Sequence, residues 1–372
     1  MNLALIQIPV EDFYYTPQRS YPLGLTYLAA ACRKLPVEIE IIDLLSSHGR
    51  RTIPVPDVFR PVLQYYPYDR SPISAFNNYF RFGASRGWIK KYFSEHFYDI
   101  CALSSNFYTY SEELVETAQI IKEASPRSII IVGGQNTGPG HDMFTSSPYI
   151  DHCLAGEAEE SFPRLIRALV NGERNLYDIP GIWDASSNKW NKPVIKKDFN
   201  FSPDITSLPP DHCHIAGKPA IQLSTSRGCP MNCRFCSVSQ TFGKKMRLKP
   251  VEITISEMRA AYDHGIRAFD IEDDNFTFNR SHCITLLSEI SRIFEDRIDC
   301  YAMNGLSTEH LDEEIIDLLI RANLRLLNIS LATSSVDRLT LLNRKTDIEH
   351  FAGIARYAGR KKIKTMGHYI VG

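Results

Sequence analysis

Short apolar runs that alternate with helical stretches are the feature that most restricts the fold of this 372-residue chain. In the first half the strand-like runs and helical stretches are residues 3–9, 24–34, 37–44, 98–104, 111–124, 128–132, 150–155 and 159–169. Strands alternating with helices predict an α/β fold with a doubly wound parallel sheet. In such a sheet, ligands bind beyond the carboxyl ends of the strands.

The same rhythm returns after residue 221. Strand-like runs at 221–225, 268–272, 298–303, 326–331 and 364–371 alternate with helical stretches at 251–264, 281–295, 310–322 and 349–360. This order predicts a (β/α) barrel or part of one. Between the halves a hairpin is expected from residues 181–184 and 189–195, around 185–188, and Ser207–Asp211 breaks regular structure. We therefore predict domains at 1–175 and 219–372, joined by a linker at 176–218.

Residues 46–97 form a long insertion within the first half, rich in proline, tyrosine and phenylalanine. Loops of this length inside a compact domain are usually functional or form a subdomain. We expect this one to cover an edge of the sheet.

Composition excludes several classes of function. The net charge of −1 gives no sign of a nucleic-acid partner, and no apolar run is long enough to span a membrane. The first residues lack the basic start of a secretory signal. Nine irregularly spaced cysteines do not suggest a disulfide framework, so a reducing, cytoplasmic location is expected.

Three of these cysteines, Cys229, Cys233 and Cys236, form a C-x3-C-x2-C run. A cubane iron–sulfur cluster normally takes four thiolates, so three would leave one iron open to a small molecule. A structural zinc site instead needs four closed ligands, and Cys213 or His214 could supply the fourth. Ordinary buried cysteines are a further alternative.

Small and polar residues follow the strand-like runs of the first half. Ser104, the pair Gly133-Gly134 and Gly156 all stand at such ends. Glycines there allow a bulky cofactor to approach the backbone. The same glycines are equally typical of tight strand-to-helix turns.

The segment Gly228–Cys236 resembles the cluster loop of the radical S-adenosylmethionine (radical SAM) enzymes, including Phe235 before the third cysteine. The resemblance implies that Cys229, Cys233 and Cys236 ligate a [4Fe-4S] cluster. The open iron would bind S-adenosylmethionine, whose reductive cleavage gives a 5′-deoxyadenosyl radical. Phe235 is implied as a cofactor contact.

A second resemblance concerns the first half, where residues 22–30, Gly133-Gly134 and 156–159 are similar to the cobalamin-binding domain that often precedes a radical SAM barrel. It implies a flavodoxin-like sheet. The Asp-x-His-x-x-Gly loop of many cobalamin proteins is absent, since position 212 is histidine. The implied cobalamin contacts are Leu23, Gly24, Ser104, Gly133, Gly134, Gln135, Gly156 and Glu157.

The radical SAM resemblance also implies contacts with S-adenosylmethionine. Glu272 and Asp273 would receive its ammonium group, although acids at a helix start also simply favour the helix dipole. Asn304 and Ser330 fall where the family contacts the ribose or carboxylate. The Glu-Ser-Gly-Ser sequence common after the fourth strand is replaced here by residues 332–335, Ala-Thr-Ser-Ser.

Residues 367–372 resemble the family's fifth barrel strand, which normally continues into a further strand. A partial barrel leaves a sheet edge with unpaired backbone groups. The expectation is a chain truncated within the barrel, the alternative being a barrel that a partner completes.

Together these resemblances imply a cobalamin-dependent radical SAM enzyme that methylates an unactivated carbon of a small-molecule substrate. An electron donor such as flavodoxin or ferredoxin would reduce the cluster. The alternatives are a cobalamin-linked radical SAM oxidoreductase or cyclase, and an inactive cofactor-binding fragment.

Overall fold

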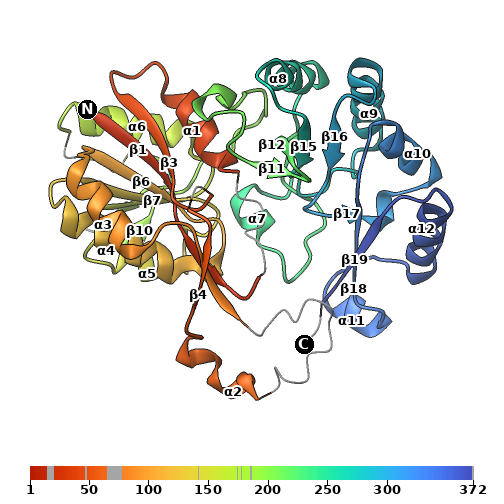
Figure 1. Cartoon of the computed structure of the whole chain (residues 1–372), viewed down its shortest axis with the longest axis horizontal. Helices are drawn as coiled ribbons and strands as arrows, with labels where there is room; N and C mark the ends of the chain where they lie inside the picture. The colour runs from red at the N-terminus through yellow and green to blue at the C-terminus, as the bar shows by residue number, and fades with distance from the viewer. Residues whose placement is uncertain are drawn as a thin grey trace. The chain divides into compact units, whose positions relative to one another are not determined.

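A computed structural model describes residues 1–14, 21–46, 48–64, 78–140, 142–173, 175–176, 178–184 and 187–370. The chain divides into two compact units, Met1–Val194 and Ile195–Gly372 (Figure 1). The division falls within the linker expected at 176–218. No described helix has the length and apolar character needed to cross a bilayer.

Five parallel strands form the central sheet of the first unit, in the order β3-β1-β6-β7-β8. Numbered among themselves, the parallel strands run 2-1-3-4-5, which is the flavodoxin-like order, so the predicted fold class is confirmed. Register aligns the carboxyl ends, with Ser104 of β6 beside Gly133 of β7. The strand bounds are β1 Asn2–Gln7, β3 Glu38–Asp43, β6 Ile100–Ser104, β7 Ile129–Gly133 and β8 His152–Leu154.

Helices cover both faces of this sheet (Figure 1). Along β1, Leu3 and Leu5 enter one core while Ala4 and Ile6 enter the other, because side chains alternate across a strand. Helices α1 (Leu23–Cys32) and α6 (Ala158–Val170) pack on the first face. The second face packs against α3 (Arg86–Glu95), α4 (Ser111–Ala124) and α5 (Asp142–Thr145), with η3 (Tyr108–Tyr110) preceding α4.

A small antiparallel sheet, ordered β2-β5-β4, accompanies the parallel one. It consists of β2 (Val10–Asp12), β4 (Arg50–Ile53) and β5 (Tyr79–Phe82), with η1 (Asp57–Phe59) and α2 (Arg60–Leu63) following β4. The described part of the insertion at 46–97 is therefore folded: it supplies β4 and β5 of the small sheet and α3 of the parallel sheet's second face. Its aromatic stretch 65–77 lies outside the described residues.

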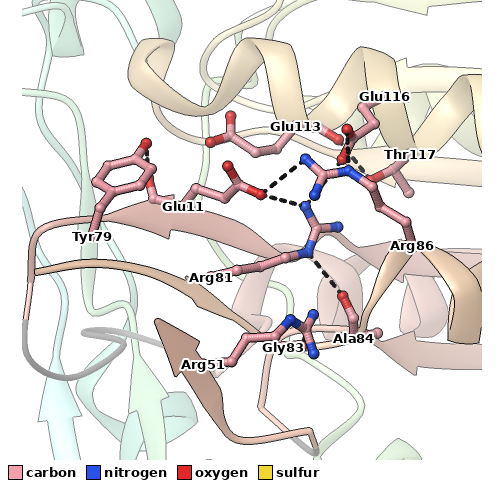
Figure 2. A network of polar contacts seen from close by, with 10 residues as sticks. All are labelled: Glu11, Arg51, Tyr79, Arg81, Gly83, Ala84, Arg86, Glu113, Glu116 and Thr117. Atoms are coloured by element: carbon pink, nitrogen blue, oxygen red, sulfur yellow. Dashed lines mark hydrogen bonds and ion pairs between the residues drawn. The ribbon is translucent and has the colours of Figure 1, made fainter. Parts of the chain in front are cut away.

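A network of ion pairs ties this small sheet to the helices (Figure 2). Arg81, only 1% exposed, contacts Glu11 at 2.7 Å and Glu116 at 3.0 Å. Arg86 contacts the same two carboxylates, at 3.1 and 2.5 Å. Arg81 Nε also donates to the carbonyl of Ala84. Since a buried charge is tolerated only when it is paired, these contacts fix the position of β5 against α4.

The two larger sheets of the second unit are ordered β11-β12-β15-β16 and β17-β18-β19, and every pair in them except β11–β12 is parallel. The strands are β11 His214–Ile215, β12 Lys218–Leu223, β15 Ala268–Ile271, β16 Asp299–Tyr301, β17 Leu306–Ser307, β18 Leu327–Ala332 and β19 Thr365–Tyr369. The helices between them lie outside the strands (Figure 1). They are α8 Val251–Asp263, α9 Arg280–Phe294, α10 Glu313–Arg321, α11 Val336–Leu341 and α12 Ile348–Arg360. This is the predicted partial (β/α) barrel.

The remaining elements are short. The predicted hairpin is confirmed as β9 (Trp183–Asp184) paired antiparallel with β10 (Lys189–Trp190), although residues 185–186 of its turn lie outside the described residues. The second unit adds η4 (Ile205–Ser207), α7 (Val238–Thr241) and η5 (Thr308–His310). A two-stranded ribbon is formed by β13 (Ser226–Arg227) and β14 (Arg247–Leu248).

Glu113, in the first turn of α4, gives the first unit a pH-dependent stability. Burial, with smaller contributions from the charges of Glu11 and Glu112, raises the pKa of Glu113 from 4.5 to about 7. The raised pKa disfavours the charged form in the folded state, so the cost is absent below pH 4.5 and complete above pH 7. We predict that Glu113→Gln increases the free energy of unfolding at pH 8 by up to about 3 kcal/mol and changes it little at pH 4.

Urea unfolding of the full chain at the two pH values measures this difference. Glu112→Gln is the matched control, because Glu112 is exposed in the same helical turn. An equal effect of Glu113→Gln at both pH values would contradict the prediction.

Candidate active site

The loop that carries the three cysteines leaves the carboxyl end of β12 through the ribbon β13–β14. Arg227 pairs with Arg247 across this ribbon. Gly228 then has φ +84°, and a Cβ there would stand 2.7 Å from the carbonyl oxygen of Lys245. Only glycine fits such a position, so Gly228 fixes the direction in which the cysteine loop (residues 229–236) departs.

Asp273, directly after β15, braces the start of this loop. Its side chain is 2% exposed. Asp273 Oδ1 accepts from the backbone N–H of Thr225 at 2.6 Å, and Oδ2 accepts from Thr225 Oγ1 at 2.5 Å and Ser226 Oγ at 2.7 Å. Burial raises the pKa of Asp273, and these hydrogen bonds act against that shift. Next to it, Asp274 Oδ2 accepts from the N–H of Gly228 at 3.0 Å.

Cation–π contacts position the segment that leads into the cysteine loop. The guanidinium of Arg227 lies 4.7 Å from the ring centroid of Phe199 and 5.5 Å from that of Phe242. Lys249 lies over Phe199 and forms a buried ion pair with Glu257 at 2.8 Å. Residues of the predicted linker thus belong to the second unit and support its candidate site.

The three cysteines of the loop differ from the other six. Cys229 and Cys233 are half-buried and Cys236 is exposed, whereas the others are buried. Asn275 Nδ2 donates to Cys229 Sγ at 3.9 Å, and Arg344 Nη1 donates to Cys233 Sγ at 3.8 Å. Accessible thiols with N–H donors on their sulfurs are the environment in which proteins hold iron–sulfur clusters.

A single metal ion fits this loop less well. Among the described residues, no three histidine, cysteine, aspartate or glutamate side chains lie close enough together to hold one ion. The carbonyl of Cys213 accepts from the N–H of Ala220 and His214 pairs with Pro219, both near the amino end of β12. The cysteine loop follows the opposite end, and that end lies roughly 10 to 13 Å along the strand from these two positions. The structure therefore does not bring Cys213 or His214 to the loop as a fourth donor.

The other residues predicted to contact S-adenosylmethionine gather at the carboxyl ends of the barrel strands. Glu272 is half-buried and its Oε1 lies 3.4 Å from Gln222 Nε2. Asn304 is exposed and donates to the carbonyl of Asp273 at 3.0 Å. Ser330 is half-buried on β18, and Phe235 is 51% exposed. A recess of about 500 Å³ beside the cysteine loop is lined by Pro230, Met246 and Phe278, among others. The individual contacts stay predictions.

The residues predicted for cobalamin lie at the carboxyl edge of the first unit's sheet. Gly134 has φ +113°, and a Cβ there would stand 2.3 Å from the carbonyl oxygen of Ser105. Gly156 has φ +83°, and its Cβ would meet Pro193 at 2.6 Å. The chain itself thus requires both glycines. Leu23, Gly24, Ser104, Gly133, Gln135 and Glu157 share this edge, Gly24 and Gln135 being exposed and Glu157 buried.

Sequence reasoning missed Arg344 and Asn275 as neighbours of the cysteines. Asn275 lies two residues after Asp273, in a segment where only the carboxylates carry a sequence-based prediction. Arg344 follows α11, 111 positions beyond Cys233, and no motif marks it.

We predict that Gly134→Ala destabilises the protein by about 1–3 kcal/mol, because the new Cβ meets a backbone atom at a positive φ. Gly87→Ala is the control, since Gly87 lies in α3 with nothing within 4 Å of its Cβ position. It should be neutral or stabilise by up to about 1 kcal/mol. Chemical unfolding of both variants measures the contrast, and equal stabilities would count against this account of the turn.

We predict that Asp273→Asn destabilises the metal-free chain by about 1–3 kcal/mol, because an amide nitrogen would face groups that donate hydrogen bonds. Glu272→Gln, one residue away and half-buried, should change stability by less than about 0.5 kcal/mol. Urea titrations of the two variants without cofactors test the difference. An Asp273→Asn variant as stable as the parent chain would show that the brace is unimportant.

Comparison with known proteins matches most of the second unit to a family and nearly the whole chain to a curated relative. Residues 223–372 match the radical SAM superfamily. The chain is 24% identical over 96% of its length to the cytidylyl-2-hydroxyethylphosphonate methyltransferase of Streptomyces wedmorensis, covering 70% of that protein. It is 27% identical over 76% of its length to the uncharacterized methyltransferase PH0819 of Pyrococcus horikoshii, covering 62% of it. The chain thus spans about two thirds of the length of these relatives.

Among solved structures, the radical SAM methyltransferase TsrM from Kitasatospora setae, with cobalamin and a [4Fe-4S] cluster bound, matches the whole chain. The TM-score is 0.71 at 16% identity, and the match covers 67% of the TsrM chain. At this identity the likeness establishes the fold. Residues 223–372, within the second unit, form a domain that matches the radical SAM superfamily.

Proposed function

We propose that this chain acts as a cobalamin-dependent radical SAM methyltransferase on an unactivated carbon of a small molecule. The observation that carries the proposal is the cysteine loop, in which Cys229, Cys233 and Cys236 are the only cysteines among the described residues that are not buried. Cys213 and His214 lie toward the other end of β12. Methyltransferases among the relatives support the reaction type. The bound groups of TsrM support the choice of cofactors.

When bound, the [4Fe-4S] cluster and S-adenosylmethionine supply a 5′-deoxyadenosyl radical, and cobalamin supplies a transferable methyl group. Cys229, Cys233 and Cys236 would ligate the cluster. Asn275 and Arg344 would donate to two of the three sulfurs. Both oxygens of Asp273 accept hydrogen bonds from Thr225 and Ser226, so Asp273 would also hold the loop in place.

Glu272, together with Asp273, is proposed to receive the ammonium group of S-adenosylmethionine. It is half-buried at the carboxyl end of β15, next to the brace. Asn304 and Ser330, at the ends of neighbouring strands, are proposed for the ribose or carboxylate, and exposed Phe235 for a packing contact.

Cobalamin is proposed to lie against the carboxyl edge of the flavodoxin-like sheet, where such folds bind ligands. Gly24 has nothing within 4 Å of its Cβ position and Gly133 only the carbonyl oxygen of Leu154, while Gly134 and Gly156 form the turns beside them. Ser104, Gln135, Glu157 and Leu23 complete the proposed contact set. We assign no protein ligand to cobalt, and we propose a flavodoxin or ferredoxin as the electron donor.

The test is anaerobic reconstitution with iron and sulfide. We predict about four irons per chain, broad visible absorption, and release of 5′-deoxyadenosine from S-adenosylmethionine under strong reductant. Replacing Cys229, Cys233 and Cys236 together with alanine should abolish all three signals. Cys213→Ala, which removes a buried cysteine away from the loop, should preserve them.

Three results would contradict the proposal. Zinc without iron in the purified chain would favour a non-redox metal protein. A loaded cluster that releases no 5′-deoxyadenosine would favour an inactive cofactor-binding fragment. Formation of methylcobalamin from reduced cobalamin and S-adenosylmethionine supports methyl transfer, and its absence from an otherwise active chain favours the oxidoreductase or cyclase alternative.

A further inference from the structure

The segment Leu342–Arg344 holds the cysteine loop from the other side of the partial barrel. The carbonyl of Leu342 accepts from the N–H of Arg234 at 3.0 Å. Asn343 Nδ2 donates to the carbonyl of Asn232 at 2.9 Å. Arg344 Nη1 donates to Cys233 Sγ at 3.8 Å. Three consecutive residues thus contact residues 232–234, and we call this segment the latch.

The guanidinium of Arg344 contacts three further side chains besides Cys233. Its side chain is 11% exposed. Nε lies 3.1 Å from Thr346 Oγ1 and 3.3 Å from Glu309 Oε1, and Nη2 donates to Ser307 Oγ at 3.2 Å. Glu309 is equally buried and accepts from Thr346 Oγ1 at 2.8 Å. These contacts orient the planar fork, so its charge stays next to Cys233 rather than moving into solvent.

We propose that Arg344 is a positioning residue that raises the reduction potential of the iron–sulfur cluster, and that Glu309 limits this effect. The inference rests on the proposed function, because it concerns a cluster bound by Cys233. Reduction adds one electron, hence one negative charge, to the group bound to that sulfur. A fixed positive charge and an N–H···S hydrogen bond stabilise the reduced form. The carboxylate of Glu309 partly neutralises the guanidinium and acts in the opposite direction.

The contact at Cys229 is of a different kind. Asn275 donates a hydrogen bond there but carries no charge, and its side chain is 3% exposed. The carboxylate of Asp274 acts electrostatically on Cys229 and Cys236, and Arg344 acts on Cys236 as well as on Cys233. Arg344 and Glu309 are the charged pair at Cys233, so their substitution separates a charge effect there from a simple loss of packing.

A redox titration of the anaerobically reconstituted full chain, followed by electron paramagnetic resonance, tests the inference with dithionite as electron source. At a fixed potential near the midpoint of the parent chain, Arg344→Gln should lower the ratio of reduced to oxidised cluster by about tenfold, which for one electron corresponds to about 59 mV. Glu309→Gln should raise the same ratio severalfold. Arg344→Lys, which keeps the charge, should lower it less than Arg344→Gln.

Arg338→Gln is the matched control, because Arg338 is an exposed arginine in α11. It should leave the ratio unchanged. Identical titrations of the parent chain, Arg344→Gln and Glu309→Gln would overturn the inference and leave the proposed function standing. A parent chain that binds no reducible cluster would overturn both. If Arg344→Gln fails to retain iron, Glu309→Gln decides alone: a higher ratio supports the inference and an unchanged ratio refutes it.

Discussion

A carboxylate buried at the end of one barrel strand determines how the next segment of chain reaches the site. Asp273 uses both oxygens to hold the backbone and hydroxyl of Thr225 and the hydroxyl of Ser226. The cysteine loop can therefore leave β12 in only one direction, which Gly228 then continues at a positive φ. Because burying an unpaired carboxylate is costly, the bonds that satisfy Asp273 also order the loop before any cofactor arrives.

Paired buried charges recur at the places where accessory segments join the sheets. Arg81 joins the small antiparallel sheet to α4. In the second unit, Lys249 pairs with Glu257 and also lies over Phe199 of the predicted linker. Pairs of this kind contribute little net stability, but removing one partner strongly destabilises the folded protein because the other charge stays buried and unpaired. They favour a single arrangement of each segment. Each of these segments thus has a defined position within its own unit.

The sequence predicted what depends on local pattern. Apolar runs and helical periodicity predicted the parallel sheets of the two units. The helix expected at 111–124 is observed with the same limits as α4. The antiparallel sheet was missed because strands such as Arg50–Ile53 are charged and lack an apolar alternation. Contacts between distant positions were also out of reach: Arg344 meets Cys233 only through folding. Asp273 is predicted to contact S-adenosylmethionine, and that contact stays a prediction; the hydrogen bonds of its two oxygens to Thr225 and Ser226 could not be predicted from local pattern.

The central claim is that three thiolates hold a cluster with one iron left free for S-adenosylmethionine. Electron–nuclear double resonance of the reduced, reconstituted chain tests it most directly, with S-adenosylmethionine labelled with ¹⁵N in the amino group or ¹⁷O in the carboxylate. The account predicts hyperfine coupling from each label to the cluster. Saturated binding of S-adenosylmethionine without coupling from either label would contradict it.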